Sequence, residues 1–217
     1  MIAAWKEAAG IAIGRQLAHP TGLGGRIIGA AMRVANRSPT RAVVEALAIR
    51  PTDRVLDIGC GDGSGTSAMA GALHVCGVDA STTMLEVARR RNRGAMARGR
   101  VSFYAGDMLH LPFDMPSFDK IAASNVLYFC RDVSAFVAEC RRVARPNARL
   151  VIFVTSRSSM LDWPFASTVT HRHFDRQSLE DELESAGVTA SLRSIDEVAL
   201  PRGITGLLAT VSLAPLA

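Results

Sequence analysis

The first fifty residues and the rest of the chain show different patterns of apolar and polar positions. Apolar residues recur at helical spacing over residues 2–18, about 26–36 and about 38–49, with a glycine-rich break after the first of these runs. Ser38 is predicted to cap the third helix, because Pro39 follows it at the first helical position. The chain is therefore predicted to begin with a glycine-interrupted helical segment that precedes a sheet.

From Arg54 onward, short apolar runs alternate with helical segments, which predicts a parallel sheet with helices on both faces. After Gly187 two strand-like runs, VTASLRSIDEVAL and ITGLLATVSLA, follow with only PRG between them. A connection this short predicts an antiparallel hairpin at one edge of the sheet. The other predicted strands are 54–58, 73–79, 101–105, 120–124 and 149–155, and the predicted helices are about 65–72, 81–97, 132–145 and 176–186.

Length and composition are those of an ordinary globular protein, with 217 residues, 48% hydrophobic and 21% charged. No window reaches the roughly 18 to 20 apolar residues of a spanning helix, and Lys6 and Glu7 precede only a short apolar run. We therefore expect no signal peptide and a cytoplasmic protein. The cysteines lack paired or metal-type spacing, so we expect reduced, packed thiols and no metal site; they are Cys60, Cys76, Cys130 and Cys140.

The formal charge of +5 is concentrated in an arginine-rich segment. Such a run could dock RNA or an anionic membrane surface. It could equally be a solvated helix end whose cations meet the negative end of the helix dipole. No aromatic residues interleave with the cations, so the second interpretation is favoured and no nucleic-acid partner is expected. The segment comprises Arg89, Arg90, Arg91, Arg93, Arg98 and Arg100.

Acidic and polar residues follow the predicted strands at the edge where a doubly wound sheet binds ligands. The first strand runs through Asp57 into the glycine-rich turn of RVLDIGCGDGSG, where Asp62 adds a second acid. The second strand ends at Asp79 and the third is followed by Asp107. The fourth strand ends at Ser124-Asn125. The sequence therefore predicts an acidic crevice along one rim of the sheet.

The acids distinguish two classes of nucleoside ligand. A dinucleotide would place its pyrophosphate against the turn, where Asp57 and Asp62 would repel it by roughly 1 to 4 kcal/mol per pair of charges. The GxGxxG pattern would also require glycine at position 64, which is Ser64. S-adenosylmethionine has no phosphate and carries an ammonium and a sulfonium, which suit carboxylates. The acids therefore favour the sulfonium ligand, although Asp79 would hold ribose hydroxyls in either one.

The chain resembles the class I S-adenosylmethionine-dependent methyltransferases, above all the small bacterial members with a methyltransferase domain of type 11. The motifs that carry the resemblance span about Arg54 to Val188: VLDIGCGDG, GVDASTTMLEVARR, AGDMLHLPFDMPSFDKIAASNVLYFCRD, VARPNARLVIF and FDRQSLEDELESAGV. It implies an α/β fold with a Rossmann-like doubly wound sheet of seven strands in the order 3-2-1-4-5-7-6. It also implies a helical lid over residues 1–50 and a methyltransferase domain over 51–217. Asn147 stands where the family often has glycine, and asparagine tolerates the positive φ of that turn.

The resemblance also implies roles for residues along the crevice, with S-adenosyl-L-methionine as cofactor and S-adenosyl-L-homocysteine as product. The three glycines would let the backbone approach the cofactor, and Asp57 would meet its ammonium. Asp79 would take the ribose hydroxyls and Asp107 the adenine amine. Ser124 and Asn125 would line the route to the methyl group. The full implied set is Asp57, Gly59, Gly61, Gly63, Asp79, Ala80, Asp107, Met108, Ser124 and Asn125.

The acceptor side is less defined by sequence. Tyr128, His171 and His173 are candidates for a general base, and Trp163 and Phe165 could either wall an apolar acceptor or pack internally. Motifs for base amino methylation, pyrimidine C5 chemistry and radical chemistry are absent from the sequence. We therefore expect methyl transfer to a small organic acceptor such as a natural product, quinone or lipid-like molecule, by a monomer or homodimer. The alternatives are an RNA or protein methyltransferase that docks through Arg89–Arg100, and a cofactor-binding member with another activity.

Overall fold

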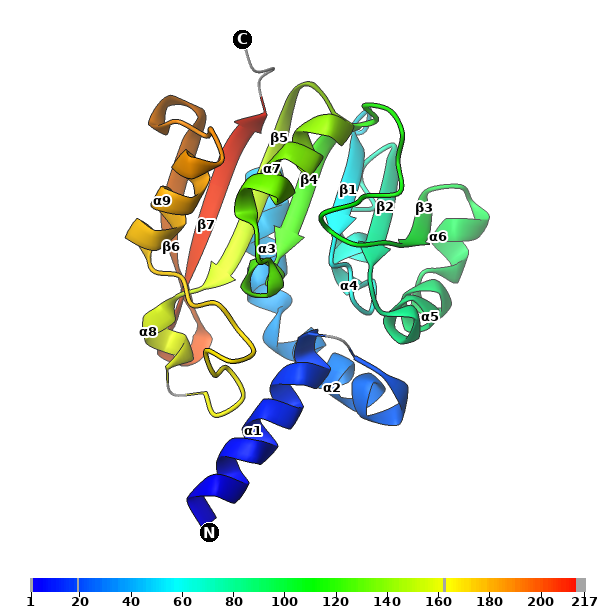
Figure 1. The fold of residues 1–217 in the computed structure, drawn as a ribbon. Helices are drawn as coiled ribbons and strands as arrows, with labels where there is room; N and C mark the ends of the chain where they lie inside the picture. The colour runs from blue at the N-terminus through cyan, green and yellow to red at the C-terminus, as the bar shows by residue number, and fades with distance from the viewer. Residues whose placement is uncertain (1, 19, 162, 214–217) are drawn as a thin grey trace.

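The computed structural model describes residues 2–18, 20–161 and 163–213. Over these residues seven strands form one sheet: β1 (Arg54–Ile58), β2 (His74–Asp79), β3 (Val101–Ala105), β4 (Phe118–Ser124), β5 (Ala144–Thr155), β6 (Arg193–Leu200) and β7 (Ile204–Leu213). Their order across the sheet is β3-β2-β1-β4-β5-β7-β6 (Figure 1). Strands β1 to β5 are parallel, and β7 runs antiparallel to both β5 and β6. The predicted strand order and terminal hairpin are confirmed.

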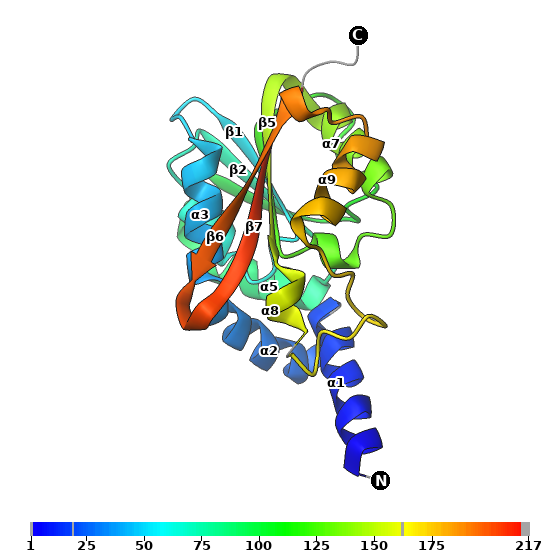
Figure 2. The same cartoon turned by 90° about the vertical axis from the view of Figure 1, so that its left-hand side faces the viewer.

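Helices cover both faces of this sheet. One face carries α3 (Arg37–Leu47), α4 (Ser64–Ala68) and α5 (Thr82–Arg91), and the other carries α7 (Val133–Val143) and α9 (Arg176–Ser185). Figure 2 shows α3 on the opposite side of the sheet from α7 and α9. The remaining helical elements are α1 (Ile2–Ala18), α2 (Gly22–Ala35), α6 (Arg93–Ala97), α8 (Arg157–Met160), η1 (Leu127–Phe129), η2 (Ala190–Leu192) and η3 (Pro201–Gly203).

The apolar runs form strands because both faces of the sheet are covered. In β1, Val55 packs into the cluster beneath α3, whereas Leu56 and Ile58 pack into the cluster beneath α7 and α9. Successive side chains of a strand point to opposite faces, so a strand buried on both sides is apolar at nearly every position. Asp57 is the exception within β1, and it is buried as well.

The N-terminal helices divide between two places. Helices α1 and α2 lie beyond the carboxyl ends of the parallel strands, whereas α3 packs on the sheet through Val43 and Leu47 (Figure 1). The hydroxyl of Ser81, just after β2, donates to the carbonyl of Pro20 between α1 and α2. Only α1 and α2 of the predicted lid therefore lie away from the sheet, and a side-chain hydrogen bond ties their connection to its edge.

Several predicted boundaries are wrong, for local reasons. Helix α2 begins at Gly22, inside the predicted glycine-rich break, and α3 begins one residue before Ser38, so Asn36 precedes it. The helix predicted over 81–97 is interrupted at Asn92, whose side-chain amide donates to the carbonyls of Ala88 and Gly63 at 3.0 and 3.1 Å. Asn147 has φ 63°, which confirms the predicted left-handed turn. None of the described helices has the length and apolar composition needed to cross a bilayer.

Candidate active site

The glycine-rich turn after β1 is held by backbone hydrogen bonds to β2. The N–H groups of Gly59 and Cys60 donate to the carbonyl of Val78 at 2.8 and 3.1 Å. Gly59, Gly61 and Gly63 all have positive φ, at 68°, 52° and 73°. This backbone region is open to glycine and strained for residues with a Cβ. The spacing of three glycines therefore sets a tight left-handed turn at the carboxyl edge of the sheet.

The three glycines face different surroundings. A Cβ on Gly59 would lie 2.0 Å from Cγ1 of Val126, and one on Gly63 would lie 2.9 Å from Cβ of Ala88. A Cβ on Gly61 would meet no atom within 4 Å. Gly59 and Gly63 therefore allow the turn to pack against the protein. Gly61 leaves backbone exposed toward open space, as an approaching ligand requires.

Asp79 lies beside Gly61 at the end of β2. Its carboxylate accepts hydrogen bonds from the N–H groups of Gly61 and Ser81, both at 2.8 Å. These two bonds fix the orientation of the side chain and hold its negative charge against the turn. Ala80, the next residue, is exposed. The structure thus brings together the glycine turn and the acid at the end of the second strand.

Asp57 lies under the turn and is 4% exposed. Its Oδ2 accepts a hydrogen bond from the hydroxyl of Thr66 at 2.6 Å. Burial raises the pKa of Asp57 from 3.8 to about 6, against the lowering effect of the Thr66 hydroxyl and with a further increase from Asp79. In the structure this carboxylate contacts the Thr66 hydroxyl after the turn. Its predicted contact with the ammonium group of a cofactor stays a prediction.

Asp62 is paired with two arginines from neighbouring helices. Its Oδ2 lies 2.9 Å from Nη2 of Arg91 on α5 and 3.7 Å from Nη1 of Arg33 on α2. The other carboxylate oxygen accepts from the N–H of Ser64 at 3.1 Å. The sequence places Asp62 among the acids of the crevice, but its charge is matched by cations whose proximity only the tertiary fold sets.

The end of β3 contributes an exposed acid and a partly buried methionine. Oδ1 of Asp107 accepts from the N–H of Leu109 at 2.8 Å, which forms a small turn after the strand. Met108 packs against the core cluster from its margin. The N–H of Gly106 donates to the carbonyl of Asp79 at 3.2 Å and so joins this turn to the end of β2. The predicted adenine-side residues therefore lie next to Asp79.

At the end of β4, Asn125 has φ 57°, and its N–H donates to the carbonyl of Phe153 at 2.8 Å. Its side-chain amide donates to Oδ1 of Asn36, between α2 and α3, at 3.1 Å. The hydroxyl of Ser124 is shielded from solvent and has no hydrogen-bond partner among the described residues. A shielded hydroxyl without a partner is uncommon in native proteins.

Tyr128 is buried, and its hydroxyl forms two hydrogen bonds. Its hydroxyl donates to Oδ1 of Asn125 at 2.8 Å and accepts from the N–H of Thr155 at the end of β5. Burial raises its pKa to about 12. A phenol with this pKa stays protonated at neutral pH, so the geometry does not favour Tyr128 as a general base.

His171 lies against the rings of Tyr128 and Phe129, with centroid distances of 5.8 and 4.9 Å. It is 5% exposed, and its Nδ1 lies 2.9 Å from Oγ1 of Thr170. Burial, with a contribution from His173, lowers the pKa of His171 to about 4. Its imidazole is neutral at pH 7. Nε2 of His173 donates to the carbonyl of Ala166 at 2.6 Å, so in this geometry His173 stabilises the conformation of the loop.

The loop after α8 is packed against α1 through two glycines. A Cβ on Gly10 would lie 2.1 Å from the carbonyl oxygen of Pro164, and one on Gly14 would lie 2.6 Å from that of Phe165. Within this loop Trp163 and Phe165 are stacked, with ring centroids 5.4 Å apart. Sequence reasoning missed this contact, although two glycines four residues apart in a helix are a signal of close backbone approach. The described residues hold no group of three His, Cys, Asp or Glu that could bind a metal ion.

Comparison with known proteins agrees with this geometry. Residues 56–152 match a family model described as a methyltransferase domain. A chain in the complex of the Haloferax volcanii Trm112 methyltransferase activator with a putative methyltransferase has the same fold, with a TM-score of 0.72 at 18% identity over 88% of this chain and 94% of that one. Together with the strand order, the family match over residues 56–152 supports the resemblance to class I S-adenosylmethionine-dependent methyltransferases.

Two curated relatives share the central part of the chain. The O-methyltransferase cnsE of Penicillium expansum is 36% identical over 115 residues, which cover 52% of this chain and 42% of that protein. The demethylmenaquinone methyltransferase of Beutenbergia cavernae is 37% identical over 113 residues, which cover 52% of this chain and 45% of that protein. The match thus spans less than half the length of either relative.

Proposed function

We propose that this chain binds S-adenosylmethionine at the carboxyl edge of β1, β2 and β4 and transfers its methyl group to a small organic acceptor. The observation that carries the proposal is the open space above Gly61, next to the fixed carboxylate of Asp79. A glycine turn bordered by acids suits a phosphate-free, cationic nucleoside and disfavours a pyrophosphate. The domain family supports the same ligand.

Each residue of the edge has a role in this proposal. Asp79 accepts from the ribose hydroxyls, and Ala80 and Met108 border the adenine with Asp107 at its amine. Asp57 adds negative potential from beneath the turn, and Ser124 and Asn125 lie toward the methyl group. The bound cofactor supplies an electrophilic methyl carbon on a sulfonium. The protein then needs to hold the acceptor atom about 3 to 3.5 Å from that carbon, in line with the sulfur.

The acceptor side is proposed to lie around η1 and the loop after α8. Phe129 and His171 contribute aromatic rings, and α1 contacts the backbone of the loop that carries the stacked rings of Trp163 and Phe165. His171, rather than Tyr128, is proposed as the group that takes a proton where the acceptor has one to lose, because its ring lies against Phe129 while the hydroxyl of Tyr128 already donates to Asn125. The curated relative from Beutenbergia cavernae, whose name gives demethylmenaquinone as its acceptor, supports an organic acceptor.

The arginine-rich segment gives the docking alternative little support. Arg89 donates to the carbonyl of Phe103, Arg91 pairs with Asp62, and Arg100 donates to the carbonyl of Ala72. Half of the cations in the segment are thus used to hold α5 and the strands together. Among the described residues, the remaining three make no cation–π contact with an aromatic ring, although stacking aromatics are typical of sites for single-stranded nucleic acid.

Calorimetry with S-adenosylhomocysteine tests the cofactor site. The wild-type chain is expected to bind it and to ignore NAD, and Asp79→Asn is expected to weaken binding at least tenfold. Asp114→Asn, at an exposed loop position, is the control for loss of one charge. Binding of NAD, or equal affinity in the Asp79 and Asp114 variants, would overturn the assignment. Mass spectrometry of candidate acceptors for the gain of one methylene then tests methyl transfer itself.

A further inference from the structure

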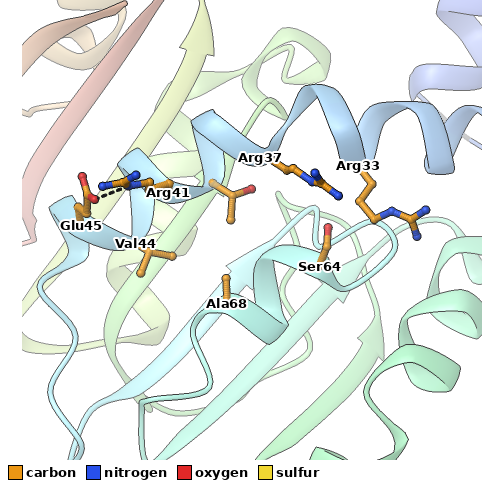
Figure 3. A pocket seen from close by; sticks show the side chains of 8 residues that line it. Arg33, Arg37, Arg41, Val44, Glu45, Ser64 and Ala68 are labelled. Atoms are coloured by element: carbon orange, nitrogen blue, oxygen red, sulfur yellow. Dashed lines mark hydrogen bonds and ion pairs between the residues drawn. The ribbon is translucent and has the colours of Figure 1, made fainter. Parts of the chain in front are cut away.

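A cavity of about 450 Å³ lies outside the proposed cofactor site, between α3 and α4. Figure 3 shows it from close by, with three arginines of α2 and α3 along one side and the outer face of α4 along the other. Arg33, Arg37 and Arg41 supply the cationic side, and Val44 with Ala68 supplies an apolar floor. Its volume is in the range of small-molecule sites.

The three arginines share one side of the helical segment because they are four residues apart. Residues at this spacing are neighbours on a helix surface, and like charges there repel one another. The spacing continues across Asn36, where α2 passes into α3. In Figure 3, Arg37 reaches down toward the hydroxyl of Ser64 at one end of the cavity. The fold thus places Arg33 and Arg37 toward the end of the cavity nearest the glycine turn, and Arg41 at the other end beside Glu45.

The local carboxylates compensate this charge only in part. Arg33 lies 3.7 Å from Asp62, whose same oxygen is already 2.9 Å from Arg91. Arg41 pairs with Glu45 at 2.8 Å, but both side chains are largely exposed, so the pair contributes little. Arg37 is exposed and, within the described ranges, forms no ion pair. The electrostatic repulsion among these guanidinium groups decreases when an anion binds between them.

We infer that this cavity, which we name the arginine groove (Arg33, Arg37, Arg41, Val44, Ser64 and Ala68), binds a small oxyanion that carries an apolar group. The planar guanidinium fork matches both oxygens of a phosphate or carboxylate. The Ser64 hydroxyl offers a further donor to the same group. Val44 and Ala68 would cover the apolar portion of the ligand. The inference does not depend on methyl transfer.

The site has a direct route of communication with the proposed cofactor site. An anion bound at Arg33 competes with Asp62 for the same guanidinium, and Asp62 is part of the turn that contains Gly61 and Gly63. Any effect of the anion on cofactor affinity must be matched by an equal effect of the cofactor on anion affinity. The arginine groove is therefore inferred to be an effector site coupled to the turn.

Calorimetry of the full chain with phenyl phosphate, inorganic phosphate and hexanoate tests the inference. Phenyl phosphate is expected to bind more tightly than inorganic phosphate, since only the former has an apolar group for Val44 and Ala68. Its comparison with hexanoate distinguishes a phosphate ligand from a carboxylate ligand. Arg37→Gln should weaken phenyl phosphate at least tenfold. Arg90→Gln, an equal charge loss at an exposed position of α5, should change it less than twofold.

Three outcomes would overturn the inference. The first is absence of binding for all three probes. The second is an equal loss in the Arg37 and Arg90 variants, which would show only general attraction of anions to a basic protein. The third concerns the carboxylate of the cofactor itself. If Arg37→Gln weakened S-adenosylhomocysteine but not methylthioadenosine, which lacks the amino-acid group, the groove would be one end of the cofactor site. Binding of phenyl phosphate with no cofactor binding would instead contradict only the proposed function.

Discussion

The hydroxyl of Tyr128 donates a hydrogen bond to Oδ1 of Asn125 at 2.8 Å, and this contact sets the end of β4. The backbone of Asn125 is in the left-handed region, at φ 57°, which asparagine tolerates. The amide of the same side chain donates to Asn36 between α2 and α3. One buried phenol thus orients the residue that joins the N-terminal helices to the proposed methyl-transfer edge.

Tyr128→Phe is expected to lower the free energy of unfolding by about 1–3 kcal/mol, because the buried N–H of Thr155 loses its acceptor. The protein has only two tyrosines, so Tyr104→Phe, at a 42% exposed position, is the matched control and should change stability by less than about 0.5 kcal/mol. Urea unfolding measures both. Loss of turnover in Tyr128→Phe with unchanged stability and an altered pH profile would show that the phenol acts as a base after all.

Glycine-to-alanine substitutions should distinguish the glycine that lets the ligand approach the backbone from the glycine that lets the turn pack against the protein. Gly61→Ala introduces a Cβ with no protein neighbour, so its stability loss should be limited to the left-handed strain of about 1–2 kcal/mol. Gly63→Ala should lose more, since its Cβ would lie 2.9 Å from that of Ala88. Affinity for S-adenosylhomocysteine should fall at least tenfold in Gly61→Ala. Unchanged affinity there would place the cofactor elsewhere.

The raised pKa of Asp57 predicts a pH-dependent stability. The native carboxyl binds its proton more tightly than the unfolded one, because its pKa rises from 3.8 to about 6. Its stabilising contribution is therefore complete below about pH 4 and is lost as pH rises through 6, by up to about 3 kcal/mol. In Asp57→Asn the free energy of unfolding should therefore depend less on pH between these two values.

Thr66→Val is the informative companion to Asp57→Asn. It removes the hydroxyl that lowers the pKa of Asp57, so the midpoint of the pH dependence should move further upward. Chemical denaturation at a series of pH values measures both variants. An Asp57→Asn protein with the same pH slope as wild type would refute the buried, proton-binding carboxyl.

The contribution of His171 to stability should have the opposite pH dependence to that of Asp57. Its native pKa is lowered from 6.5 to about 4, so the unfolded chain binds the proton more tightly. The contribution to stability is complete above pH 6.5 and is lost as pH falls through about 4. His171→Gln should remove this loss, whereas His110→Gln, at an exposed position, should not. If His171 takes a proton from the acceptor, turnover should also fall by roughly 10² or more at pH 7.5; equal turnover in the two variants would exclude that role.

Docking of α1 should depend on Gly14. Alanine favours a helix over glycine by roughly 0.5–1 kcal/mol, so Gly24→Ala in α2, whose Cβ meets nothing within 4 Å, should stabilise the protein. Gly14→Ala should instead destabilise it and speed limited proteolysis near α1, because its Cβ would lie 2.6 Å from both Phe165 O and Thr170 Oγ1. A Gly14→Ala protein as stable as Gly24→Ala would show that α1 does not rest on this loop.

The sequence by itself determined the layers and most of the proposed cofactor edge. Apolar runs such as RVLDI and RLVIFVT form buried parallel strands, because burial on both faces leaves no polar alternation. The right-handed crossover rule then brings the ends of β1 to β4 to one rim, so Gly61, Asp79 and Asn125 meet there. The residue type alone was also enough to predict the left-handed turn at Asn147, since few residues tolerate a positive φ.

Only the tertiary structure decided what each polar group faces. Asp57 and Asp62 read alike in the sequence, yet one is buried against Thr66 and the other is neutralised by arginines 29 positions before and after it. The same holds for Tyr128 and His171, whose pKa values are shifted by burial that no local pattern encodes. Side-chain charge is set by desolvation and by neighbours from distant segments. These depend on how helices pack over the sheet, which the order of residues along one element does not reveal.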